Sequence, residues 1–479
     1  MDTYYVSSLI AVFVDTAIFL LALSYLSLSL DDFLLDCFFY ARGIWRKMRG
    51  LDRNPLRVEE LAKKPEARIA VFIPCWHEAE VVEHMLSLAL QKIAYKRYEI
   101  FVGVYPNDPQ TQARVDAICA RTTQVRKVVN PTPGPTTKAQ NLNSMFARMR
   151  EVEGADPFEI VVLHDVEDVI HPLSLKLYNK FMPENDMVQI PVFPLPRAMR
   201  RFTSWTYADE FAENHMKDMV VREAIGAFVT CAGVGCAFKR SALEVLGRLR
   251  NGTIFRDTAL TEDYQLSLDM KLHGFKTAFV KEIPLGADAH IATRAYFPDD
   301  FRAAIRQKTR WVTGICLQAW QMQGWKGSPA VRYALYRDRK SLFGNFACVL
   351  GYPVMLLGFA LSAWHSADPH VVVAVFRHTA VIFDSLYSVI AIAVWRILQR
   401  AVQVGRVYGS RAALFSILRF PWANIINGCA VFSAVYIYLL SMIRREPLRW
   451  AKTKHVFPVD AVESRTAGYD QSFDLEGVA

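Results

Sequence analysis

The stretch that most constrains this chain is an apolar run that ends in a cluster of acidic residues. Residues 158–163 read Phe-Glu-Ile-Val-Val-Leu and are followed by His-Asp-Val-Glu-Asp. An unbroken row of isoleucine, valine and leucine predicts a strand buried on both faces of a sheet, with the acids at its carboxyl end. Side chains two apart in an extended chain point the same way, so Asp165 and Glu167 are expected to reach one cation together while Asp168 faces elsewhere. The alternative is a solvated acidic turn, and the rest of the chain decides between the two.

The region around this stretch alternates between strand and helix patterns. Strands are predicted at Ile69–Cys75, Glu99–Val104, Val125–Val129, Phe158–His164 and Met187–Val192, with helical segments after the first three, two of them beginning at Glu78 and Thr137. Such alternation predicts an α/β fold with a mainly parallel sheet covered by helices. The ligand site of such a sheet lies beyond the carboxyl ends of its strands.

The chain is also expected to enter a membrane. Val6–Leu30 is nearly continuous apolar sequence without the basic start or small-residue cleavage site of a signal peptide, so it predicts a retained anchor. Asp31–Gly50 mixes aromatic and basic residues and is predicted to be an amphipathic linker along the membrane surface. Its basic residues place the following segment in the cytoplasm by the positive-inside rule.

Three further apolar blocks follow Lys340. Ser341–Trp364 and Val371–Trp395 are predicted to span the bilayer. Trp422–Ile443 is predicted to be interfacial or re-entrant, because spanning would place the basic cluster after it outside the cytoplasm.

These patterns divide the chain into four regions. They are an anchor with its linker at 1–50, a cytoplasmic catalytic domain at 51–335, transmembrane and interfacial helices at 336–443, and a tail at 444–479.

Composition excludes several classes of protein. The chain is 52% hydrophobic, which is too apolar for an ordinary soluble enzyme of 479 residues. Its eight cysteines show no C-x-x-C spacing, which argues against a disulfide or zinc scaffold. The net charge of +9 arises from basic residues beside apolar segments, and no nucleic-acid-binding motif is present. Attraction to anionic lipid therefore accounts for the charge without a nucleic-acid partner.

Six polar motifs follow one another along the chain, and none is a zinc-protease or Walker motif. They are Ile73-Pro-Cys-Trp-His-Glu78, Tyr105-Pro-Asn-Asp108, Thr136-Thr-Lys138, the acidic cluster at 165–168, Thr261-Glu-Asp263 and Gln307-Lys-Thr-Arg310-Trp311. In this order they resemble the family-two glycosyltransferases with the GT-A fold. The resemblance covers the stretch from Arg68 to Trp311 and extends to the membrane topology.

The resemblance implies a donor site for a nucleotide sugar, with UDP as the expected nucleotide. Glu78 and Asp108 would hold the base and ribose, and Lys138 the diphosphate or the uracil side. Asp165 and Glu167 would bind the divalent metal, Mg²⁺ or Mn²⁺, that holds the diphosphate. Asp108 stands in a turn that differs from the paired acids usual in the family.

The resemblance also implies an acceptor site. Asp263 would be the catalytic base, and Gln307, Arg310 and Trp311 would hold the acceptor and the leaving diphosphate. A single base without a nucleophilic partner suggests displacement with inversion. The structural alternatives are that Asp263 caps a helix and that Trp311 belongs to the core.

The tail resembles the gating segment of membrane polysaccharide synthases. The matching residues are Trp450, Lys452, Thr453 and His455. Lys452 and His455 would then meet the phosphates of the bound nucleotide, and the segment would lie in the cytoplasm.

The activity implied is transfer of a hexosyl or N-acetylhexosaminyl group at the bacterial inner membrane. The acceptor would be a growing envelope polysaccharide or glycan, with an outer-membrane or export partner for its product. Two alternatives stay open: transfer of one sugar to a lipid-linked acceptor, and a membrane scaffold or receptor-assembly protein with a degenerate transferase fold.

Overall fold

The computed structural model describes residues 3–51, 56–285, 289–373, 380–446, 448 and 457–458, without the side chains of residues 380–386. Its centre is a seven-stranded sheet with strand order β3-β2-β1-β4-β6-β5-β7. The strands are β1 (Ile69–Pro74), β2 (Tyr98–Val104), β3 (Val125–Val129), β4 (Ile160–Leu163), β5 (Met187–Gln189), β6 (Cys236–Lys239) and β7 (Thr277–Phe279). Only β6 runs antiparallel to its neighbours. The predicted α/β class with a mainly parallel sheet is confirmed.

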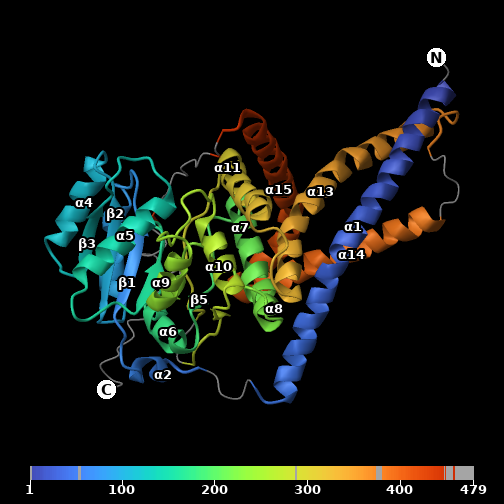
Figure 1. Cartoon of the computed structure of the whole chain (residues 1–479). Helices are drawn as coiled ribbons and strands as arrows, with labels where there is room; N and C mark the ends of the chain where they lie inside the picture. Colours follow the sequence, from blue (N-terminus) through green and yellow to red (C-terminus); the bar gives the residue numbers. More distant parts are fainter. Residues whose placement is uncertain are drawn as a thin grey trace.

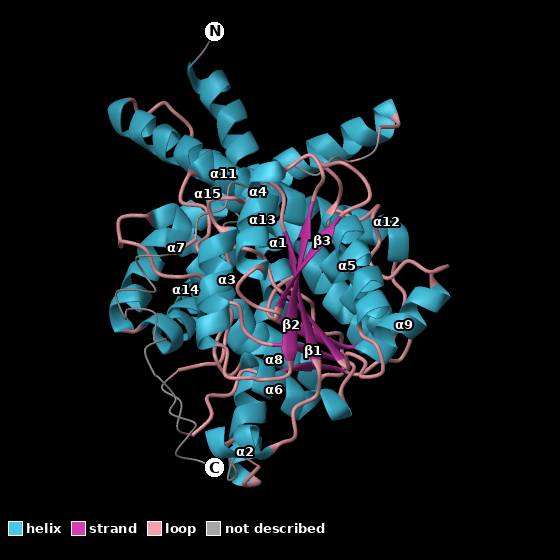
Figure 2. Ribbon diagram, turned by 90° about the vertical axis from the view of Figure 1, so that its left-hand side faces the viewer, coloured by secondary structure: helices cyan, strands magenta, loops and turns pink. Residues whose placement is uncertain are grey.

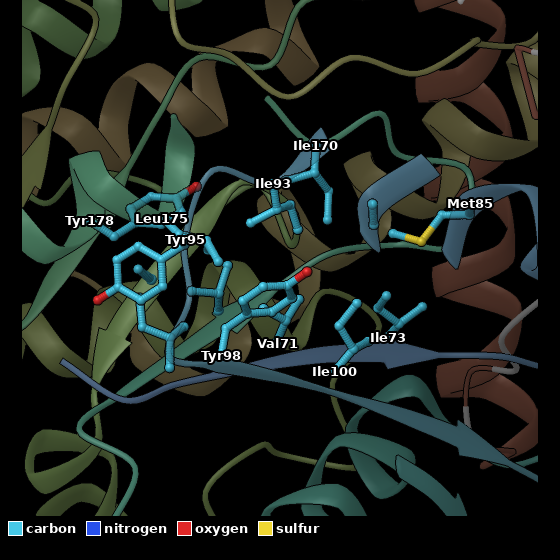
Figure 3. Packing of buried hydrophobic residues seen from close by; sticks show 14 of the residues in the cluster. Val71, Ile73, Met85, Ile93, Tyr95, Tyr98, Ile100, Ile170, Leu175 and Tyr178 are labelled. Carbon is cyan, nitrogen blue, oxygen red and sulfur yellow. The ribbon is translucent and has the colours of Figure 1, made fainter. Parts of the chain in front are cut away.

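Helices cover both faces of this sheet (Figure 2). They are α3 (Val82–Lys92), α4 (Pro109–Cys119) and α6 (Ser174–Phe181) with the short turn η1 (Met182–Glu184) on one face, and α5 (Lys138–Val152), α9 (Arg240–Leu249) and α10 (Glu262–Leu272) on the other. The first strand shows why two layers form. Val71 and Ile73 pack toward α3, whereas Phe72 between them packs toward α5, as the period of two in a strand requires. Figure 3 shows Val71 and Ile73 beside Met85 of α3.

Several helices connect the sheet domain to the long carboxyl-terminal helices. They are α7 (Phe202–Glu213), the π-helical turn η2 (Asn214–Asp218), α8 (Met219–Ala224), α11 (Phe301–Trp311), a second π-helical turn η3 (Val312–Gln318) and α12 (Ala319–Gln323). The short helix α2 (Val58–Lys63) precedes β1 and packs against α6. Helix α3 begins four residues after the predicted start at Glu78, because residues 78–81 form a turn.

The long helices are α1 (Thr3–Met48), α13 (Pro329–Ala367), α14 (Ala380–Tyr408) and α15 (Ser410–Arg444). Figure 1 shows α1, α13 and α14 projecting from the sheet domain, while α15 runs beside α7 and α11. Among the described residues, three helices are long and apolar enough to cross a membrane: α1, α13 and α15. Part of the predicted span Val371–Trp395 lies outside the described residues.

Two predicted segments take a simpler form than expected. The proposed linker Asp31–Gly50 continues α1 without a break as far as Met48. The block Trp422–Ile443 lies within the single helix α15. This helix continues in one direction, whereas a re-entrant segment would turn back. Its place relative to a bilayer stays a prediction.

A network of ion pairs joins α1 to the rest of the molecule. Asp31 accepts from Arg337 and Lys340 of α13, at 2.7 and 2.5 Å. Asp36 accepts from Lys217 of η2 at 2.5 Å. Asn214 and His215 of the same π-helical turn line a cavity at the carboxyl ends of the strands. Helix α1 therefore contacts the wall of that cavity.

The contact between α7 and α15 centres on a buried pair. Arg419 of α15 donates two hydrogen bonds to Asp209 of α7, at 2.8 and 2.7 Å, and the two side chains are 0% and 2% exposed. The two charges compensate each other in the interior. Removal of one partner is costly, because it leaves the other charge buried and unpaired.

Replacement of Asp209 with alanine is therefore expected to lower the free energy of unfolding by about 3–5 kcal/mol. Chemical denaturation of the purified protein in detergent measures this change. Glu151→Ala is the matched control: its partner Arg148 lies at a similar distance of 2.9 Å, but both side chains are more than half exposed, so the loss should stay below about 1 kcal/mol. Equal losses in the two variants would contradict the assignment.

Candidate active site

A single cavity of about 430 Å³ lies at the carboxyl ends of β1, β2 and β4. Its wall contains residues from motifs that are far apart in the sequence. Those that the sequence singled out are Glu78, Lys138, Asp165, Glu167, Asp263, Gln307, Arg310 and Trp311. The fold therefore brings together all of the predicted catalytic-domain residues except Asp108.

Lys138 is the positive centre of this cavity. Thr137 caps the amino end of α5, since its hydroxyl accepts from Gln140 N–H while the Gln140 side chain accepts from Thr137 N–H. This cap places Lys138 in the first turn of α5, where its ammonium donates to Asp165 Oδ1 at 2.5 Å and to the Gly233 carbonyl at 3.2 Å. Burial alone would lower the pKa of Lys138, but Asp165 and Glu262 outweigh it and raise that pKa above its usual value. The lysine is therefore charged at neutral pH.

The acidic cluster forms a turn, because the Asp168 N–H donates to the Asp165 carbonyl at 3.1 Å, so the alternation expected of an extended chain does not apply to it. Asp165 and Glu167 are half-buried in the cavity wall. Asp168 is buried beside them and accepts from the Asp165 N–H at 3.0 Å, with His164 Nδ1 2.9 Å away. Its burial raises the pKa of Asp168, although His164 acts against this. Asp168 thus fixes the backbone that carries Asp165.

No larger metal-binding group surrounds Asp165 and Glu167. Within the part of the chain that the structure describes, no three His, Cys, Asp or Glu side chains lie close enough together to hold a metal ion. Mg²⁺ is commonly held by one or two carboxylates together with substrate phosphates. Two carboxylates from the protein are therefore as many as such a magnesium site commonly contains.

Asp263 lies opposite Lys138, in the first turn of α10. The residue at the N-cap of this helix is Thr261, so Asp263 is not the cap. Asp263 accepts from the Tyr264 N–H at 2.8 Å. Burial raises the pKa of Asp263 despite the opposing effect of Lys138. Burial and the neighbouring Asp263 also raise the pKa of Glu262 to about 7.

Gly233 makes this approach of charges possible. A methyl group at Gly233 would lie 2.5 Å from Asp263 Oδ2 and 3.5 Å from Lys138 Nζ, so only a residue without a side chain fits. Its φ of +76° also favours glycine. The sequence showed Gly233 within Cys231-Ala-Gly-Val-Gly-Cys236, but nothing in that pattern indicated its contact with Asp263.

Helix α11 supplies the part of the cavity wall that contains Gln307, Arg310 and Trp311. Asp300 caps it by accepting from the Ala303 N–H at 2.8 Å. At its other end Trp311 packs against Tyr207 and Phe211, with ring centroids 5.9 and 6.1 Å away. Trp311 is therefore both a cavity residue and part of an aromatic cluster, so the two interpretations of its role are compatible.

The helix then widens into the π-helical turn η3. Gly314 of η3 lies against Thr261, since a methyl group at Gly314 would be 2.5 Å from Thr261 Oγ1. Short π-helical turns occur frequently at functional sites. This one links α11 to the residue that precedes Glu262 and Asp263.

Asp108 has a different place from the one predicted. It does not line the cavity: it caps α4, and its carboxylate accepts from the His77 N–H at 2.7 Å. His77 has a φ of +54°, so Asp108 holds a turn that few non-glycine residues adopt. This turn carries Trp76, which lines the cavity with Tyr105, the two rings 4.9 Å apart. Sequence reasoning missed Trp76 and Tyr105, although both stand inside the motifs it used.

The predicted gating residues Trp450, Lys452, Thr453 and His455 lie outside the described residues. Phe457 is described and is buried against the core of the sheet domain, where it stacks on His84 of α3 with 6.4 Å between ring centroids.

A family model described as "Glycosyltransferase like family 2" matches residues 65–314, which is more than half of the chain. The chain belongs to glycosyltransferase family 2. The fold described above is accordingly the GT-A fold expected for this family. The family assignment makes the protein a glycosyltransferase by descent.

Two curated relatives of this family-two chain come from Escherichia coli. Bacteriophage adsorption protein B of strain K12 is 38% identical over 458 residues, which cover 91% of this chain and 61% of that protein. Bacteriophage N4 adsorption protein B of O157:H7 matches with the same figures. The chain thus spans about 61% of the length of these relatives.

Solved structures with a similar fold are more distant from this family-two chain. A mannosyltransferase from Pyrobaculum calidifontis, in complex with GDP-Man and Mn²⁺, is 18% identical with a TM-score of 0.49, over 83% of this chain and 99% of that one. Residues 1–349 of TarS from S. aureus are 13% identical with a TM-score of 0.35, over 75% of this chain and 90% of that one. No residue assignment rests on these likenesses.

Replacement of Gly233 with alanine is expected to displace Asp263 and Lys138 and to lower sugar transfer by at least about a hundredfold, the usual contribution of a well-placed base. Initial rates of transfer at saturating donor measure the loss. The matched control is Gly226→Ala: Gly226 has the same φ of +76°, but a methyl group there meets no atom within 4 Å. Both variants carry the same backbone strain, so a comparable loss of rate in the control would show that strain, rather than contact with Asp263, is responsible.

Proposed function

We propose that this protein is a membrane-bound, metal-dependent, inverting glycosyltransferase that transfers a sugar from a UDP-linked donor to a growing polysaccharide or glycan of the bacterial envelope. The observation that carries the proposal is the convergence of the donor, metal, base and Q-x-x-R-W residues on one cavity. A family-two chain that had lost its activity would not be expected to keep these residues facing one another.

The donor half of the cavity fits a nucleotide diphosphate. Trp76 and Tyr105 offer aromatic faces to a base, and Glu78 lies beside them in the wall. Lys138 brings a permanent positive charge to the phosphate region. Asp165 and Glu167 would hold Mg²⁺ or Mn²⁺, and the bound ion would offset the charge of the departing diphosphate.

The acceptor half fits a hydroxyl nucleophile. Asp263 would take the proton of that hydroxyl as it attacks the sugar, a step in which one base and no covalent intermediate gives inversion. Arg310 would stabilise the negative charge on the leaving diphosphate. Trp311 would offer a ring face to the acceptor sugar, and Gln307 a polar contact beside it.

The proposed location of this reaction is the cytoplasmic face of the inner membrane, and helix α13 supports a site close to the bilayer. Asp338 of α13 belongs to the cavity wall, so the acceptor half opens toward a helix that is apolar enough to cross a bilayer. An acceptor that stays attached to the membrane fits this arrangement, whether it is a growing polymer or a single lipid-linked sugar. An export partner would then receive a polymeric product.

The tail is proposed to act as a gate over the bound nucleotide, through Trp450, Lys452, Thr453 and His455. The contact of Phe457 with His84 supports this proposal, because it returns the tail to the domain that carries the donor site.

A second function has one observation in its favour. The names of the two relatives refer to bacteriophage adsorption, which suits a scaffold or receptor-assembly role. Hydrolysis of nucleotide sugars by the purified protein with Mn²⁺ separates the two functions, since a scaffold would leave every donor intact. A screen of donors on membranes, with sizing of the product, then distinguishes a polymer from a single transfer.

Asp165→Asn and Glu167→Gln are each expected to abolish metal-dependent donor binding, because each removes a charged ligand and keeps the shape of the side chain. Titration calorimetry with UDP at fixed Mn²⁺ measures the affinity. Asp168→Asn, from the same turn, should keep more of this binding, because its oxygen can still accept from the Asp165 N–H. Unchanged affinity in both ligand variants would remove the metal assignment.

Asp263→Asn is expected to keep donor binding while transfer falls by about a hundredfold or more. Since burial raises the pKa of Asp263, the wild-type rate should fall as the pH is lowered through that raised pKa, where the base becomes protonated. Glu262, with a pKa of about 7, contributes its own titration near neutral pH. The rate of Asp263→Asn should lack most of this acid limb, and an unchanged pH profile would show that another group is the base.

A further inference from the structure

Two thiols face each other in the loop that supports Lys138, and the proposed reaction uses neither. Cys231 and Cys236 are both free and buried, and their sulfur atoms lie 3.0 Å apart. We propose that this pair is an oxidation site: a peroxide converts the two thiols to a disulfide, and the bridged loop disables the donor half of the cavity.

The two sulfurs have different surroundings, which assigns their roles. Cys231 lines the cavity, and the Gly233 N–H donates to its sulfur at 3.4 Å. A peroxide that enters the cavity therefore meets the Cys231 sulfur first. Cys236 begins β6 and is fully buried, and burial raises the pKa of its thiol. Cys231 is therefore the attacking thiol and Cys236 the resolving one.

The chemistry balances with hydrogen peroxide as oxidant. The Cys231 thiolate attacks one oxygen, the O–O bond breaks, and the other oxygen leaves as water after taking up the proton that Cys231 released, so that Cys231 becomes a sulfenic acid. Cys236 then attacks that sulfur, the S–O bond breaks, and a second water leaves with the proton of Cys236. The two thiols lose two electrons and two protons in total. A dithiol reductant reverses the change by exchange.

The loop between the cysteines is the one that touches the charged centre. The Gly233 carbonyl accepts from Lys138, and Gly233 has no room to move toward Asp263. A covalent S–S bond is about 2.0 Å long, so its formation draws the ends of this short loop together. The bridge must then shift Gly233 and with it the position of Lys138. This consequence rests on the proposed function, whereas formation of the bond does not.

Mass spectrometry tests the bond itself. The purified full-length chain in detergent is reduced, freed of reductant and treated with hydrogen peroxide without metal. The peptide with both cysteines should become lighter by two hydrogen atoms, and a dithiol should restore its mass. Cys37 is exposed and reports that the oxidant acted, and Cys119→Ala is a control variant that keeps the pair. Oxidation of Cys37 while Cys231 and Cys236 stay reduced would overturn the proposal.

Binding of UDP with Mn²⁺ tests the consequence. The oxidised wild type should bind about tenfold more weakly than the reduced form, within the usual range of coupling between sites. Peroxide should leave the UDP affinity of the Cys236→Ala variant unchanged. If Cys236→Ala does not fold, Cys231→Ala serves as the control variant in its place. Formation of the bridge with unaltered UDP affinity would show that the loop does not control the donor half. Absence of UDP binding even in the reduced wild type would instead count against the donor assignment, while the mass readout still decides on the thiol pair.

Discussion

The site depends on one buried ammonium group. Lys138 enters from α5, Asp165 from the end of β4 and Gly233 from the loop before β6, and these three meet through hydrogen bonds of the lysine. Without that charge, the acids at 165, 262 and 263 would repel one another inside a protein interior that screens charge poorly. Lys138 therefore makes it possible to hold several carboxylates around one cavity. The glycines of the neighbouring loop serve the same end, because they let the chain approach this cluster closely.

Much of the site followed from local chemistry that the sequence displays. The run of buried residues before Asp165 predicted the strand, whereas the alternation expected for residues 165–168 assumed an extended chain and these residues form a turn. Thr137 and Gln140 give α5 a recognisable start. These features depend on residues close together in the sequence, so they can be predicted before the tertiary structure is known.

The remainder depends on contacts between distant segments. Strands β6 and β7 were not predicted from the sequence, and they become evident only through their pairing with β4 and β5 in the sheet. Asp108 was expected to touch the nucleotide, yet it caps α4 and holds the turn at His77. This contact joins residues 31 apart in sequence, so the local pattern around Asp108 did not indicate it. The same holds for Gly233, whose contact with Asp263 appears only when α10 packs beside the loop.

The continuity of α1 has a consequence for the order in which the molecule assembles. Asp31 is made early, but its partners Arg337 and Lys340 are 306 and 309 residues further along the chain. At about 5–20 residues per second, a ribosome takes at least about 15 seconds to reach them. During that interval the acids at the base of α1 have no lasting counter-charge from α13, and the sheet domain folds between the two. The ion pairs between α1 and α13 thus form only when α13 has been made, and α13 also supplies Asp338 to the cavity wall.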